Sequence, residues 1–126
     1  MSLAQLAALK ATLLAFALEL PGAYEDHPWE DTVAKVDKKI FAFLGSDDPR
    51  YGHLLTVKLP ASGSGVLMLG CAEPAGYNLG KSGWVSLRHD RGELPPAELL
   101  CDWIEESYRA VALKRRVKEL EAGRDR

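Results

Sequence analysis

The stretch Thr32-Val-Ala-Lys-Val-Asp-Lys-Lys-Ile-Phe-Ala-Phe-Leu44 decides the fold, because two short apolar runs in it are separated by only two residues. Thr32–Val36 and Lys39–Leu44 contain the β-branched and aromatic residues that favour strands. Asp37-Lys38 between them has the length of a tight hairpin turn. Aspartate tolerates the positive φ of such a turn, whereas lysine adopts it poorly. The stretch therefore predicts a β-hairpin with an unusual turn.

Two strands with alternating patterns are predicted further along the chain. In His53–Leu59, Leu55, Val57 and Leu59 face one way, and Leu54, Thr56 and Lys58 face the other. In Gly83–His89, the outward set is Trp84, Ser86 and Arg88. Between these strands, the apolar run Val66–Ala72 is predicted to be a short helix and Pro74–Leu79 a brief strand.

Two long helices are predicted to flank the strands. The first has apolar residues at helical spacing from Leu6 to Leu20 and ends at Pro21-Gly22. The last begins near Pro95-Pro96 and frays beyond Val111. Its inner stripe consists of Leu100, Trp103, Ile104, Ser107, Tyr108 and Val111. Strand-rich blocks between helices predict an α+β fold. We expect a two-layer α/β sandwich with an antiparallel sheet of about five strands, the order α-β-β-β-α-β-β-α, and the helices on one face.

Length and composition fit one domain over residues 1–126, with 47% hydrophobic and 27% charged residues. The net charge of −2 argues against a strongly basic nucleic-acid binder, although Arg109–Lys118 carries five cations and no acid. No apolar run reaches the ~18–20 residues that a membrane span needs, so no membrane association is expected. Cys71 and Cys101 lie far apart and form no CxxC motif, which favours a reducing, cytoplasmic location.

No recognised catalytic motif is present: GxSxG, GxxxxGK[ST] and HExxH are all absent. We therefore expect no catalytic residue, no metal site and no cofactor. Asp26 and His27, with Glu25 nearby, are residue types that serve in metal sites and acid–base pairs, and they support a weaker hypothesis of an enzyme or metal binder. In the alternative interpretation, His27-Pro28-Trp29 packs a loop over the core.

Aromatic and cationic residues gather in the outward-facing positions of the later strands. Lys58 lies on one strand, and Trp84 and Arg88 lie on the other, with Tyr77 and Lys81 shortly before them. Aromatics beside cations suit phosphate contacts combined with base stacking. The five residues are therefore candidate nucleic-acid-binding residues, and Lys58, Lys81 and Arg88 are expected to form one positive patch. In the alternative interpretation, Trp84 and Tyr77 pack within the fold and the cations are merely solvated.

Four segments together resemble the MmcQ/YjbR family. Leu20-Pro-Gly-Ala-Tyr-Glu-Asp-His-Pro-Trp29 resembles its Leu-Pro-Gly-x-x-Glu-x-x-Pro-aromatic opening, and Val36–Ala42 resembles its hairpin. Gly76-Tyr-Asn-Leu-Gly-Lys-Ser-Gly-Trp-Val85 is similar to its glycine-tyrosine, lysine and tryptophan segment. Ile104-Glu-Glu-Ser-Tyr108 matches its Ile-x-x-Ser-Tyr signature. Two departures are Asp37-Lys38 in place of a glycine pair and the Gly/Ser-rich Ala61–Gly65.

The resemblance implies a small α/β protein whose fold is likened to frataxin or to type III secretion chaperones. Members are often labelled DNA-binding, which implies a non-enzymatic cytoplasmic protein that binds DNA through the cationic open face of its sheet. Lys81 and Trp84, with Tyr77 beside them, match the family pattern. The alternative is a protein-interaction or chaperone-like module with no nucleic-acid role, which binds a partner chain or a second copy of itself.

Overall fold

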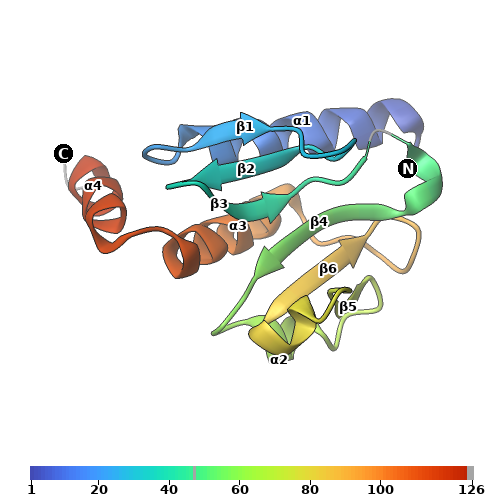
Figure 1. Cartoon of the computed structure of the whole chain (residues 1–126). Coiled ribbons are helices and arrows are strands. Elements are labelled where there is room, and N and C mark those ends of the chain that lie inside the picture. The colour runs from blue at the N-terminus through green and yellow to red at the C-terminus, as the bar shows by residue number, and fades with distance from the viewer. Residues whose placement is uncertain (47, 125–126) are drawn as a thin grey trace.

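The computed structural model describes residues 1–46 and 48–124, with helices at both ends of the chain and strands between them (Figure 1). In chain order the elements are α1 (Leu3–Glu19), β1 (Tyr24–Asp26), β2 (Val33–Val36), β3 (Lys39–Phe43), β4 (His53–Lys58), α2 (Gly63–Val66), β5 (Ala72–Pro74), β6 (Trp84–Arg88), α3 (Ala97–Val111) and α4 (Lys114–Arg124). None of the described helices has the length and apolar composition needed to cross a bilayer.

One antiparallel sheet organises the molecule. Its six strands lie in the order β1-β2-β3-β4-β6-β5, and each strand runs antiparallel to its neighbours. The helices α1 and α3 pack against each other and cover one face of the sheet (Figure 1). The core lies between the two layers and includes Leu13, Phe41, Leu55 and Ile104, each 0% exposed. The predicted α+β sandwich with helices on one face is therefore confirmed.

The number of strands is a correction: the sheet has six strands rather than about five. The additional strand is β1, which pairs with β2 through Tyr24↔Lys35 and Asp26↔Val33. It is a polar, three-residue edge strand, so it shows none of the apolar alternation that reveals a half-buried strand. The element order becomes α-β-β-β-β-α-β-β-α-α.

Three other elements also differ from their predicted bounds. The middle helix α2 is a single turn at Gly63–Val66 instead of Val66–Ala72. The strand β5 covers Ala72–Pro74 and not Pro74–Leu79, because Tyr77 and Asn78 both adopt positive φ and turn the chain. The segment after Val111 does not fray. It forms the separate helix α4, whose Leu120 is only 8% exposed.

Two hydroxyl groups fasten α3 to the rest of the fold. The buried Ser107 Oγ donates a hydrogen bond to the carbonyl of Phe41 in β3 (2.5 Å) and accepts one from the amide of Lys58 in β4 (2.8 Å). The Tyr108 hydroxyl donates to the carbonyl of Pro21 (2.6 Å), and its ring meets that of Phe41 edge-on. Tyr108 of α3 and the Pro21-Gly22 turn after α1 are therefore in direct contact.

The β2–β3 turn is held in place by α4. Asp37 and Lys38 both have positive φ (52° and 66°), as a type I′ turn requires. The Asp37 carboxylate accepts hydrogen bonds from the amide of Leu113 and from Arg116 Nε. Burial acts to raise the pKa of Asp37, but these donors and the nearby Arg115 hold it below its usual value. The start of α4 thus lies directly beside the turn.

Candidate nucleic-acid interface

The open face of the sheet carries the outward residues that strand alternation predicts. Phe43, Thr56 and Ser86 lie in one row across β3, β4 and β6, and the Thr56 and Ser86 hydroxyls are hydrogen-bonded at 2.8 Å. The predicted outward position of Leu54 is wrong. A bulge between His53 and Leu55 turns the Leu54 side chain into the core. Among the described elements, no helix covers this face (Figure 1).

Lys58 and Trp84 are direct neighbours across the β4–β6 ladder. The Trp84 indole packs edge-on against Phe43 with ring centroids 5.6 Å apart, and it is half-buried. Because Phe43 covers part of the indole ring, Trp84 contributes to packing within the sheet face as well as to the solvent-exposed surface. The structure thus brings Lys58 and Trp84 together as one corner of a candidate interface.

Tyr77 is the most exposed aromatic side chain in the described part of the molecule, at 100% exposure. It stands in the turn after β5 with φ +56°, a conformation that costs a non-glycine residue free energy. Lys81 follows in the 3₁₀ turn Leu79–Ser82 and is also exposed. This segment presents an aromatic ring and a cation to solvent just before β6 begins.

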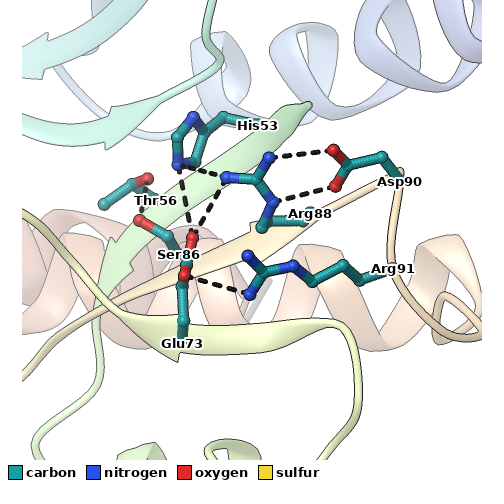
Figure 2. Close-up of polar contacts among 7 residues, drawn as sticks. All are labelled: His53, Thr56, Glu73, Ser86, Arg88, Asp90 and Arg91. Carbon is teal, nitrogen blue, oxygen red and sulfur yellow. Dashed lines mark hydrogen bonds and ion pairs between the residues drawn. The ribbon is translucent and has the colours of Figure 1, made fainter. Parts of the chain in front are cut away.

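Arg88 lies at the opposite end of β6 from Trp84. Its charge is compensated by neighbouring carboxylates (Figure 2). Its guanidinium donates twice to Asp90 at 2.8 Å and once to Glu73 at 3.2 Å. The hydrogen bonds with Asp90 are the largest cause of its raised pKa, and in return Arg88 lowers the pKa of Asp90 to about 2. The expectation that Arg88 joins Lys58 and Lys81 in one patch is therefore corrected, since β6 separates Arg88 from Trp84 by its whole length.

The Glu73 carboxylate also contacts the neighbouring basic side chains. Glu73 lies 3.5 Å from His53 Nε2 and 3.3 Å from Arg91, so one acid of β5 contacts three basic side chains (Figure 2). A group in which two arginines and a histidine meet Glu73 and Asp90 is close to neutral, and it offers little attraction to a phosphate.

His89, next to this cluster, gives a prediction for stability against pH. Its Nε2 is buried without a hydrogen-bond partner among the described residues, and burial, followed by the charge of Lys10, lowers its pKa. The unfolded chain therefore takes up the proton first as pH falls below about 6.5. The free energy of unfolding should decline from pH 7 towards about pH 5.5 in urea titrations, and His89→Gln should make this decline smaller. The same change at exposed His27 serves as the control, and an unaltered decline in His89→Gln would contradict the assignment.

The lysines are distributed unevenly over the molecule. Because neighbouring strands are antiparallel, β2 ends, β3 begins, β4 ends and β6 begins at one end of the sheet. The start of α4 is tied to the same end through Asp37. Six of the eight lysines lie there, and we call this region the lysine end: Lys38, Lys39, Lys58, Lys81, Lys114 and Lys118. None of the six makes an ion pair with any residue in 1–46 or 48–124.

Acidic side chains gather at the opposite end of the sheet. There β1 ends, β2 begins, β5 begins and β6 ends. The region is called the carboxylate end here, and it contains Asp26, Glu30, Asp31, Asp48, Glu73 and Asp90. The arginines nearest to it, Arg50, Arg88 and Arg91, are each paired with one of these acids. The net charge of −2 thus conceals a positive end and a negative end.

Asp26 and His27 are not arranged as an isolated acid–base pair. Asp26 pairs with Lys35 at 2.8 Å, and His27 Nε2 lies 2.6 Å from Glu25. Within the described ranges, no group of three or more His, Cys, Asp and Glu side chains is placed to hold a metal ion. The expectation that Trp29 packs over the core is wrong, since its side chain is 91% exposed.

Sequence reasoning missed the cations of the hairpin turn and of α4. Lys38 and Lys39 lie within an acid-rich stretch, so a windowed charge count hides them. The signal for α4 was present in the acid-free run Arg109–Lys118. Only the contact between Asp37 and the start of α4 joins these segments, which are more than 70 residues apart.

Comparison with known proteins places this architecture in a family. A search of curated proteins finds no match. A family model described as YjbR matches residues 18–110, nearly three quarters of the chain. The matched region begins before the Pro21-Gly22 turn and extends beyond Tyr108, so it contains both sides of the contact between Tyr108 and Pro21. The chain therefore belongs to the YjbR family.

Proposed function

We propose that this protein is a non-enzymatic DNA-binding protein and that the lysine end contacts the phosphate backbone. The supporting observation is that six lysines without ion-pair partners among the described residues occupy one end of a protein whose net charge is negative. Clustered lysines attract the regularly spaced phosphates of nucleic acid and release condensed counterions on binding. Phosphate contacts of this kind fix position without reading base sequence.

The aromatic groups of the interface have different roles in this proposal. Tyr77 is fully exposed and is free to stack on an unpaired base or to enter a groove. Trp84 is partly covered by Phe43, so it supports the surface near Lys58. Arg88 has no part in the interface, because Asp90 and Glu73 engage its guanidinium. We also propose a cytoplasmic location, which both free thiols, Cys71 and Cys101, favour.

The salt dependence of DNA binding tests this function. With a fluorescently labelled duplex, anisotropy titrations should give a plot of log affinity against log salt with a slope of about −4.5, because about five phosphates would be neutralised. The same titration with a labelled single strand shows whether Tyr77 adds stacking, since Tyr77→Ala should then weaken single-strand binding more than duplex binding. Absence of duplex binding at low salt, or an affinity that does not change with salt, would overturn the proposal.

A protein partner or second copy on the open sheet face is less well supported. Ser86 is 4% exposed, Trp84 packs against Phe43, and the Arg88 network forms ion pairs within the same face. These contacts leave little apolar area there for another chain to bury.

A further inference from the structure

A second surface lies on the helical side of the molecule. Two adjoining hollows of about 530 and 430 Å³ meet at Leu69 and Leu99, so they form one groove between the α2 region and the first turns of α3. The lining of the first includes Ala61, Ser62 and Gly65 of the α2 region and Trp103 of α3. The lining of the second includes Gly70 and Glu93. We refer to the two together as the α2–α3 groove.

The groove has both polar and apolar lining residues, and its leucines remain partly open to solvent. Leu69 and Leu99 are 39% and 38% exposed. The adjacent Met68 is 87% exposed, and Leu67 is 39% exposed. Burial of the exposed apolar surface of these side chains by a partner would favour a complex. Methionine and leucine around a hollow are typical of surfaces that receive an apolar face of another segment.

The walls of the groove are fixed before any ligand arrives. The Glu106 carboxylate accepts hydrogen bonds from the amides of Ala61 and Ser62 and from the Ser62 hydroxyl, and it thereby fastens the start of α2 to α3. At the other end, the Gly92 turn lies so close to Gly70 that a Cβ on Gly92 would approach its backbone to 3.2 Å. A preformed groove loses little entropy when it is filled.

The charge around the groove defines its occupant. Glu93 lines it, and Glu98 and Asp102 lie one helical turn apart on α3, beside Leu99 and Trp103. None of these three carboxylates forms an ion pair within the described part of the chain. Like charges would meet if a second copy docked with the same groove, which disfavours a symmetric dimer. Lysine or arginine next to apolar side chains is the complementary pattern.

We propose that the α2–α3 groove binds a basic amphipathic helix of a protein partner, with the apolar face of that helix over Leu69 and Leu99. The partner's cations then lie opposite Glu93, Glu98 and Asp102. This binding mode, in which a helix lies in a groove, depends on apolar anchors at helical spacing with charges beside them. It is independent of the DNA-binding proposal, because the groove and the lysine end share no residue.

A synthetic amphipathic helix of leucine and lysine is the probe, and its counterpart with glutamate in place of every lysine is the matched probe. Fluorescence anisotropy should show binding of the lysine peptide and none of the glutamate peptide. Gly65→Leu should weaken binding at least about tenfold, because its new side chain would project into the groove. A Cβ at Gly65 meets no atom within 4 Å, so this variant removes no native contact and should keep its far-UV circular dichroism.

Reversing acidic residues at two different places distinguishes binding at the groove from a general attraction of the peptide to a negatively charged protein. Glu98→Lys with Asp102→Lys should also weaken binding about tenfold, whereas Glu30→Lys with Asp31→Lys, which changes the net charge equally at the carboxylate end, should not. Equal weakening by both pairs, or unchanged binding to Gly65→Leu, would overturn the proposal. Sedimentation of a dimer that Gly65→Leu dissociates would overturn it as well, because the occupant would then be a second copy.

Discussion

Replacing Ser107 by alanine is expected to lower the free energy of unfolding by about 3 kcal/mol. The ladder between β3 and β4 has only two residue pairs, Ala42↔Val57 and Phe43↔Thr56. Beyond these pairs the strands diverge, and the Ser107 hydroxyl hydrogen-bonds both the Phe41 carbonyl and the Lys58 amide. Alanine would leave both groups without a partner, and each unpaired buried group costs about 1–3 kcal/mol.

Urea denaturation followed by circular dichroism measures this change. Thr12→Ala is the matched control, because Thr12 also donates its hydroxyl to a backbone carbonyl within a helix but is exposed. Its free energy of unfolding should change by no more than about 0.5 kcal/mol. A Ser107→Ala variant as stable as the parent would show that Ser107 does not join the diverging strands.

Reversing two lysines of the lysine end is expected to weaken duplex DNA binding about 100-fold. Lys38 at the hairpin turn and Lys118 on α4 are exposed and make no ion pair with a described residue. Lys38→Glu with Lys118→Glu therefore removes two attractive charges and adds two repulsive ones without breaking a contact of the fold. A loss of about 1.4 kcal/mol per site corresponds to a factor of ten each. The salt slope should also become shallower by about two.

The matched control reverses two cations at the other end. Arg50→Glu with Arg91→Glu changes the net charge by the same amount, but both arginines lie near the carboxylate end. Affinity for the duplex should decrease by less than about threefold, because these arginines lie at the opposite end of the sheet and salt screens their interaction with phosphates bound at the lysine end. If both double variants lose affinity equally, only the overall charge matters and the lysine end is not the contact surface.

Strand periodicity was sufficient to predict which face each regular strand presents. The outward positions of Thr56, Lys58 and Trp84 follow from the two-residue period of a strand, and the structure confirms them. Leu54 departs from the pattern because a bulge shifts the register. Such a shift depends on the partner strand, and no local residue pattern reveals it.

The candidate site was less predictable than the fold because its charges are defined by tertiary neighbours. Arg88 looked free in sequence, yet Glu73 reaches it only because β5 pairs with β6 through Glu73↔Ser86. Lys38 and Lys114 come to the same end of the sheet only because the start of α4 is hydrogen-bonded to Asp37. Lys38 likewise adopts positive φ in a turn whose other central residue, Asp37, is hydrogen-bonded by Arg116 of α4.

The separation of the lysine end from the carboxylate end gives the molecule a permanent electric dipole along its strands. A polyanion exerts a torque on such a dipole before any atoms touch, so it turns the lysines forward during diffusion. Encounters would then begin in the productive orientation, which raises the association rate at low ionic strength.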